Sequence, residues 1–520
     1  MPDGSIARIE NLRVEFQTKS GTVVGVEDVS FNINPGETVC VVGESGSGKS
    51  VSSLSLMRLI EYGGGDIAGG RLLFDRKDAG EVDLSETDQD LMRTIRGNEI
   101  GMIFQEPMTA LNPVFTVGRQ LTEGLRLHKN MTKAQAEARA LDLMRQVRIP
   151  EPERRLKQYP HELSGGMRQR VVIAMALACE PRLLIADEPT TALDVTIQAE
   201  ILALMDRLKR ETGTAVMFIT HDMAVVAQMA DRVVVMFRGN KVEEGTVEEI
   251  FENPQHPYTQ SLLAAVPKLG EMTGTDLPRP MRLLGRDGSD VPPITGSDEV
   301  LLEVKNLTTR FEVKGGFFRR TVANVHAVED LSFTVNKGQT LSLVGESGCG
   351  KSTAGRSILR LVEPMSGSVF LDGKNIMALT QSELREARRD MQMVFQDPFA
   401  SLNPQMQLSE QVAEPLRNFG IGSSAEMQKK VENLFDRVEL PRSFMQRYPH
   451  ELSGGQRQRI AIARALALNP TLIVADEAVS ALDVSVQAPV LNLMLELQAE
   501  LGLSFLFISP DMAVVDRVSP

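Results

Sequence analysis

Short apolar runs alternate with amphipathic segments along most of the chain. Runs of strand length cover 38–42, 182–186, 215–219 and 341–344. The stretch 132–147 instead repeats its apolar positions at helical spacing. Strands that alternate with helices in this way predict an α/β fold with a largely parallel sheet. No apolar run reaches the roughly 18 residues that a bilayer span requires, so we expect no transmembrane helix.

The pattern occurs twice because the chain contains an internal repeat, which predicts two similar domains. Three short blocks of sequence recur in the same order in both copies. The distance from the first block to the second is longer in the first copy than in the second, whereas the distance from the second block to the third is the same in both copies. The first copy therefore contains a short insertion, which we place in the polar stretch around 75–90. The repeated blocks are 43–50 and 345–352, 159–166 and 448–455, and 184–188 and 473–477.

A segment rich in Gly, Pro, Asp and Arg separates the two copies. It covers 273–298, and its prolines and glycines interrupt both the helical and the strand periodicity. We therefore predict a first domain over 1–272, a linker over 273–298 and a second domain over 299–520.

Each copy contains the pattern G-x-x-x-x-G-K-[ST] directly after an apolar strand. Glycines allow backbone N–H groups to converge on phosphates, and the helix that follows presents its positive end. We expect Lys49 and Lys351 to contact the β- and γ-phosphates of ATP, and Ser50 and Ser352 to bind Mg²⁺. Cys349 is read as a small residue within the second loop. The predicted nucleotide-binding residues here are Gly43, Glu44, Ser45, Gly46, Ser47, Gly48, Lys49 and Ser50, and Gly345, Glu346, Ser347, Gly348, Cys349, Gly350, Lys351 and Ser352.

Two carboxylates end a later apolar strand in each copy. In the first copy, Asp187 is placed to bind Mg²⁺ and Glu188 to polarise the attacking water as a general base. Asp476 and Glu477 occupy the same places in the second copy. An acidic pair at a strand end is common by itself, and the upstream phosphate loop is what favours a catalytic interpretation.

Composition narrows the alternatives. The 520 residues carry a formal net charge of -13, which disfavours a general nucleic-acid binder. Three cysteines are too few for a disulfide framework, so we expect a reducing compartment. The first residues, Met1-Pro2-Asp3-Gly4, show no signal-peptide pattern.

The motif Leu-Ser-Gly-Gly, present in both copies, resembles the signature of the ABC-transporter ATPases. A serine and two glycines that open a helix form a second anion-binding N-terminus. The resemblance implies tandem P-loop domains, each with a RecA-like mixed-sheet core and a helical subdomain. It also implies that each signature binds the γ-phosphate of the ATP held by the opposite domain. The signature residues are Ser164, Gly165 and Gly166, and Ser453, Gly454 and Gly455.

Further family residues follow from the same resemblance. Gln105 and Gln396 look like the loop glutamines that contact Mg²⁺ and water and face the membrane partner. His221 looks like the switch histidine that contacts the γ-phosphate. Phe16 and Phe311 lie where an adenine-stacking aromatic is expected, although both also fit as ordinary strand-end core residues.

The segments 108–113, 399–404 and 255–263 resemble the di/oligopeptide importer branch and, more narrowly, the ATPases of glutathione importers. The resemblance implies two integral-membrane permease subunits, a periplasmic solute-binding protein and no nucleic acid as partners. It implies a peripheral location on the cytoplasmic face of the bacterial inner membrane. The transported peptide would not bind this chain, and its length and identity stay open.

The second copy departs from the family pattern. Pro510 follows Asp476 at the same spacing at which His221 follows Asp187, and proline lacks an imidazole. The chain also ends before counterparts of 233–237 and of the His256-Pro257-Tyr258 segment, so we expect a truncated second domain with an exposed apolar edge. We therefore expect slow or absent hydrolysis at the second site. Two alternatives stay open: a degenerate or non-hydrolysing remnant, and a soluble twin ATPase that acts on ribosomes or DNA.

Overall fold

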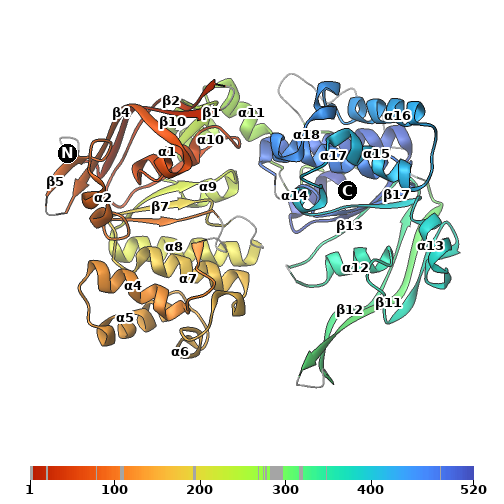
Figure 1. The fold of residues 1–520 in the computed structure, drawn as a ribbon, viewed down its shortest axis with the longest axis horizontal. Helices are drawn as coiled ribbons and strands as arrows, with labels where there is room; N and C mark the ends of the chain where they lie inside the picture. The colour runs from red at the N-terminus through yellow and green to blue at the C-terminus, as the bar shows by residue number, and fades with distance from the viewer. Residues whose placement is uncertain are drawn as a thin grey trace. The chain divides into compact units, whose positions relative to one another are not determined.

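The computed structural model describes two compact units, Met1–Leu263 and Ala264–Pro520 (Figure 1). The predicted bounds of the domains and linker stay a prediction. The residues described are all except 1–3, 19–20, 78, 106–109, 191–194, 268, 273, 276–277, 282–296, 316–319, 347, 481 and 520.

One mixed sheet organises the first unit, in the order β5-β4-β1-β2-β10-β9-β3-β8-β7-β6. The central strands β9, β3, β8, β7 and β6 run parallel, whereas β1, β2, β4 and β5 pair antiparallel. The predicted α/β fold is confirmed. The strands are β1 Ala7–Thr18, β2 Gly21–Ile33, β3 Thr38–Val42, β4 Gly65–Arg76, β5 Gly80–Asp83, β6 Ile100–Ile103, β7 Leu183–Asp187, β8 Ala215–Ile219, β9 Arg232–Phe237 and β10 Asn240–Thr246.

Helices cover this sheet, and α7 and α8 lie on the opposite side of β7 from α1 (Figure 1). The side chains of Thr132 and Gln135 form a capping box at the start of α5. The helix expected over 132–147 therefore begins at this capping box. The helices are α1 Lys49–Leu56, α2 Gln89–Ile95, α4 Val117–His128, α5 Lys133–Gln146, α6 Pro152–Arg155, α7 Gly165–Leu177, α8 Val195–Thr212, α9 Met223–Met229, α10 Val247–Glu252 and α11 Pro257–Ala264, with 3₁₀ turns η1 Ile60–Gly63 and η2 Pro160–Glu162.

The second unit repeats the arrangement with two separate sheets, β12-β11-β14-β15 and β13-β18-β17-β16. Its strands are β11 Val300–Gly315, β12 Arg320–Asn336, β13 Thr340–Leu343, β14 Ser366–Leu371, β15 Lys374–Asn375, β16 Met391–Val394, β17 Leu472–Asp476 and β18 Ser504–Ile508. Its helices are α12 Lys351–Ile358, α13 Gln381–Ala387, α14 Pro398–Ser401, α15 Leu408–Asn418, α16 Ser424–Arg437, α17 Gly454–Leu466, α18 Val484–Leu501 and α19 Met512–Val518, with 3₁₀ turns η3 Ile376–Ala378, η4 Arg442–Gln446 and η5 Pro449–Glu451.

The sheets differ because β9 and β10 have no counterparts among the described residues of the second unit. In the first unit β10 pairs with β2 at Asn240 and Asp28, and thereby joins the antiparallel strands to the parallel ones. In the second unit β13 pairs with β18 alone, and β13 is half-buried where β3 is fully buried. Among the described residues β13 thus lies at an edge of its sheet, and the truncation predicted for the second copy stays a prediction. The hairpin β4–β5, with 12 and 4 residues against 6 and 2 in β14 and β15, lies where the insertion was placed.

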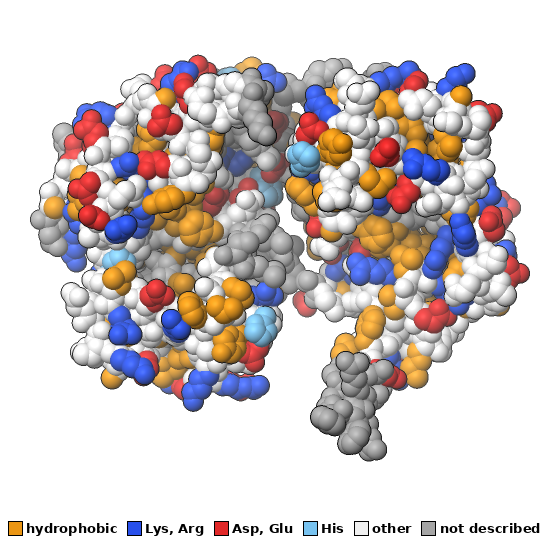
Figure 2. Space-filling model, in the orientation of Figure 1, with side chains coloured by type: hydrophobic (Ala, Val, Ile, Leu, Met, Phe, Trp, Pro, Cys, Tyr) orange, Lys and Arg blue, Asp and Glu red, His pale blue; other side chains and the backbone are white. Residues whose placement is uncertain are grey.

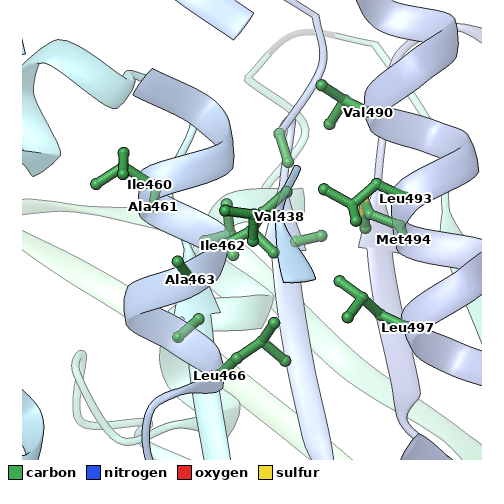
Figure 3. Close-up of a cluster of buried hydrophobic side chains, with 14 of the residues drawn as sticks. Val438, Ile460, Ala461, Ile462, Ala463, Leu466, Val490, Leu493, Met494 and Leu497 are labelled. Atoms are coloured by element: carbon green, nitrogen blue, oxygen red, sulfur yellow. The ribbon is translucent and has the colours of Figure 1, made fainter. Parts of the chain in front are cut away.

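Apolar side chains between the layers hold each unit together. In the first unit, α1 packs between the antiparallel strands and the parallel strands, where Leu56 contacts the same buried cluster as Val14 and Ile185. In the second unit the largest cluster lies around α17 and α18 (Figure 3). Ile462 and Leu466 of α17 point toward Leu493 and Leu497 of α18 (Figure 3). Burial of this kind is the main stabilising contribution to a domain.

Candidate nucleotide-binding sites

The first phosphate loop is built from glycines and one buried lysine. Gly43, Gly46 and Gly48 adopt positive φ angles, which side chains other than that of glycine rarely adopt. Gly48 is the N-cap of α1, so the loop delivers its backbone N–H groups to the positive end of that helix. Lys49 Nζ donates to the carbonyl oxygens of Gly43, at 2.7 Å, and Glu44, at 2.8 Å. These bonds hold the lysine across the mouth of the loop.

A hydroxyl and a carboxylate meet beside this lysine. Ser50 Oγ donates to Asp187 Oδ1 at 3.0 Å, from the start of α1 to the end of β7. Burial raises the pKa of Asp187 to about 6, although Ser50 and Lys49 oppose the shift. The pair places two oxygen donors next to the phosphate loop, as Mg²⁺ requires. Ser50 and Asp187 therefore fit a magnesium ion, and the full set of predicted metal ligands stays a prediction.

Glu188 follows Asp187 with a φ of 48°, so the chain turns sharply at the end of β7. Gln105 Nε2 donates to Glu188 Oε2 at 2.9 Å, and His221 Nδ1 lies 3.4 Å from Glu188 Oε1. The backbone N–H of Glu188 donates to Ile219 O, which anchors the turn to β8. Three residues that are far apart in sequence thus meet around one carboxylate.

The second unit reproduces the same contacts up to the switch position. Lys351 Nζ donates to Gly345 O at 2.7 Å and to Glu346 O at 2.8 Å. Ser352 Oγ donates to Asp476 Oδ1 at 2.6 Å. Of the predicted loop residues, Ser347 lies outside the described part of the chain.

The second general-base position differs from the first in its surroundings. Gln396 Nε2 donates to Glu477 Oε2 at 2.6 Å, and burial raises the pKa of Glu477 while Lys351 opposes the shift. The backbone N–H of Glu477 donates to Ile508 O, as in the first unit. Pro510 follows β18 where His221 follows β8, so its ring cannot supply a hydrogen bond.

Each signature motif opens a long helix. Ser164 is the N-cap of α7 and accepts from Met167 N, and Ser453 is the N-cap of α17 and accepts from Gln456 N. Gly455 is buried, and a Cβ there would lie 2.1 Å from Val486 Cγ1. The motif glycine is thus required for close packing against α18. Ser164, Gly165 and Ser453 are exposed, which leaves these helix starts accessible to an anion.

The two predicted stacking rings lie in different environments. Phe16 packs against the core of the first unit, and a Cβ on Gly25 would lie 2.7 Å from its ring. Phe311 is 43% exposed on β11. Adenine stacking by either ring stays a prediction.

Tyr258 is a candidate residue that the sequence reasoning did not single out. Its hydroxyl accepts from the backbone N–H of Glu44 at 3.0 Å, and its ring packs on Phe237 with the ring centres 4.2 Å apart. Tyr258 belongs to α11, so this helix reaches the phosphate loop directly. The segment 255–263 indicates the importer branch and differs between the two repeats, but its sequence alone does not indicate a contact with the phosphate loop.

Two family models match the chain. The family model described as "ABC transporter" matches residues 26–191 and 328–480. The model described as "Oligopeptide/dipeptide transporter, C-terminal region" matches residues 242–282. Among solved structures, the dimeric ATP-binding cassette MJ0796 bound to ADP and Pi is 28% identical, with a TM-score of 0.42, and covers 46% of this chain and 98% of its own.

Curated relatives are similar over the whole chain. The Glutathione import ATP-binding protein GsiA of Pectobacterium atrosepticum is 53% identical over 525 residues, covering 100% of this chain and 84% of that protein. The protein of the same name from Escherichia coli K12 is 52% identical over 522 residues, covering 99% of this chain and 84% of its own. Because these matches span both repeats, the chain belongs to the ABC transporter ATPases, in their oligopeptide/dipeptide branch.

Proposed function

We propose that this chain hydrolyses Mg²⁺-ATP to drive import of glutathione or a peptide of similar size. The family match establishes an ATP-binding, energy-coupling subunit of a peptide importer. The observation that carries the catalytic proposal is the meeting of Glu188 and His221 at the ends of β7 and β8, beside Asp187, on which the charge of Lys49 at the start of α1 acts. Loss of transport and of ATPase activity together is the expected consequence of disrupting it.

The first site supplies each group that phosphoryl transfer needs. Lys49 and the loop N–H groups stabilise charge on the phosphates, and Glu188 accepts a proton from the attacking water. Gln105 orients the Glu188 carboxylate through its 2.9 Å hydrogen bond. Ser50 and Asp187 would hold Mg²⁺, which neutralises charge on the phosphate oxygens when bound. The exposed signature serines are proposed to bind the γ-phosphate.

We infer that the second site hydrolyses ATP slowly. It retains the lysine, the magnesium pair and Glu477, but Pro510 replaces the histidine. The second site would therefore bind nucleotide and contribute little turnover. This arrangement favours an asymmetric motor over a decayed gene product, because the first site has its full set of groups.

Membrane permease subunits are the expected partners of an importer ATPase. Among the described residues, no helix has the length and apolar character needed to cross a bilayer. A hollow beside the loop of Gln396 offers a place for such a partner, since its lining combines apolar side chains with two arginines. It is lined by residues that include Leu359, Leu361, Arg388, Met393, Phe395, Pro415 and Arg464.

We also propose a periplasmic solute-binding protein as the component that selects the cargo, and a location on the cytoplasmic face of the inner membrane. Lys/Arg and Asp/Glu side chains are interspersed over the face of the molecule shown in Figure 2. That mixture, together with the net charge of -13, favours a membrane-protein partner over ribosomes or DNA.

The test begins with a tagged chain purified from its native membranes. Two permeases should co-purify, and the complex in proteoliposomes with its solute-binding protein should accumulate labelled glutathione or a short peptide when ATP is present. Lys49→Ala should abolish uptake while the permeases still co-purify. Co-purification with ribosomes, or uptake that does not depend on Lys49, would refute the proposal.

A further inference from the structure

The segment 264–281 starts at the last residue of α11 and lies between the two sequence repeats, and it belongs to the second compact unit. Ala265 and Met281 both belong to the apolar cluster formed around α17 and α18, and Met281 is 1% exposed. Met272 is also buried. We call 264–281 the strap; its residues 268, 273 and 276–277 lie outside the described part of the chain.

One anchor of the strap lies on α18. The side chain of Asn492 forms two hydrogen bonds with the backbone of Met281. The N–H of Met281 donates to Asn492 Oδ1 at 2.7 Å, and Asn492 Nδ2 donates to Met281 O at 2.8 Å. Asn492 is itself buried. A buried amide in an apolar helix face is costly unless both its donor and its acceptor are satisfied, and the strap backbone satisfies one of each.

A second anchor lies on α19. Asp516 Oδ2 accepts from the backbone N–H groups of Gly270, at 3.1 Å, and Met272, at 3.3 Å. Arg517 Nη2 forms an ion pair with Glu271 Oε2 at 2.8 Å, and Arg517 Nη1 lies 3.5 Å from Met272 Sδ. Arg517 is only 8% exposed, whereas Glu271 is exposed, so the ion pair anchors an exposed carboxylate of the strap to a buried guanidinium of α19.

The first repeat has no strap, so it shows which residues stand at the positions of Asn492, Asp516 and Arg517 when no strap is bound. When the two copies are aligned through Asp187 and Asp476, the equivalent positions on α8 and α9 are Ala203, Ala227 and Gln228. All three are exposed in the first unit. The anchoring side chains are therefore not required by the shared fold. They occur only in the copy that receives the strap.

We propose that α18 and α19 form a docking surface for the described residues of the strap, and that this docking joins the two halves of the chain independently of the covalent linker. The chain then leaves the first unit through a segment that is part of the second unit. The oligopeptide/dipeptide C-terminal model matches residues 242–282, and the described residues of this region belong to two different units. The boundary between the units lies at the end of α11. Tyr258 contacts the phosphate loop of the first unit, and the strap contacts the second.

Hydrogen exchange on the full-length chain tests the docking. The backbone N–H groups of Gly270, Met272 and Met281 should exchange slowly in the wild-type protein. The variant Asn492→Ala/Asp516→Ala/Arg517→Gln carries the first unit's own residues at these positions, so its fold should persist. Exchange at the three amides should be about tenfold faster or more in this variant, the scale of one lost hydrogen bond. Amides of β17 serve as the internal control and should not change. Fast exchange of the strap in the wild type, or unchanged protection in the variant, would overturn the proposal.

Cleavage of the linker tests whether the docking joins the halves. A protease recognition sequence is inserted between Gly288 and Ser289, within 282–296, which lies outside the described residues. After cleavage, without nucleotide and with a magnesium chelator, the halves of the otherwise wild-type chain should elute together from a sizing column. The halves of the triple variant should separate. Separation without the substitutions, or co-elution of the cleaved triple variant, contradicts the proposal.

Discussion

Asymmetric hydrolysis is the prediction with the largest expected effect. Replacing Glu188 by Gln removes the proposed general base of the first site, while Glu477→Gln removes that of the second. In the first site Glu188 has Gln105 at 2.9 Å and His221 at 3.4 Å, whereas Pro510 leaves the second site without an imidazole. The two variants are nearly isosteric with the wild type, so differences between them report on chemistry.

The magnitude follows from the missing imidazole. A hydrogen bond to a charged group contributes about 1.5–3 kcal/mol, which corresponds to roughly a 10- to 150-fold difference in rate. The second site should then supply at most about a tenth of total turnover. Glu477→Gln should leave about 90% of the ATPase rate or more. Glu188→Gln should leave about 10% or less, since a general base contributes about 10²–10⁴-fold to its own site.

Steady-state phosphate release by the purified chain measures both rates, and labelled ATP binding checks that each variant still binds two nucleotides. Adding Pro510→His to Glu188→Gln should restore part of the lost turnover by completing the second site. Equal losses in the two single variants would refute the reasoning, because they would show that the histidine position does not distinguish the sites.

Three further predictions concern the loops and the magnesium pair. The raised pKa of Asp187, about 6 against 3.8, means that the folded state holds this proton more tightly than the unfolded state does. The nucleotide-free protein should therefore lose up to about 3 kcal/mol of stability as the pH rises from about 4 to about 6, and Asp187→Asn should remove this part of the pH dependence of urea unfolding. Tyr258→Phe should weaken ATP binding in calorimetry by about tenfold or less, since Glu44 N–H loses its acceptor, and an unchanged Kd would show that the contact is incidental. Gly350→Ala should lower the melting temperature more than Gly348→Ala, because its Cβ would lie 1.9 Å from Ala327 O whereas that of Gly348 meets nothing within 4 Å; equal effects would count against it.

Much of the fold could be predicted from the sequence, because local patterns fix it. The helix expected over 132–147 is α5, and the runs at 182–186 and 215–219 are β7 and β8. The phosphate loops and strand-end carboxylates were identifiable because each motif is contiguous in sequence.

Contacts between distant segments could not be predicted in the same way. The segment around 273–281 reads as linker because prolines and glycines interrupt its periodicity, yet Met281 is buried and forms hydrogen bonds with Asn492, a residue of the distant helix α18. Nothing local to Asn492 indicates that its amide pairs with a backbone. The bond from Tyr258 to Glu44 was missed for the same reason.

The divided sheet of the second unit affects how cooperatively that unit unfolds. In the first unit, β10 pairs with β2 at Asn240 and Asp28 and with β9 along its length, so opening the antiparallel strands also breaks a backbone link to the parallel strands that include β3. In the second unit no ladder between described residues joins β11 and β12 to β13, and the layers meet through the apolar side chains around Val304 and Val474. Proteins open in roughly contiguous cooperative units, so we expect the antiparallel layer of the second unit, which shares no ladder with the parallel strands, to open as its own substructure. The phosphate loop of the first unit therefore lies within one continuous sheet. That of the second unit lies between two sheets that can open separately.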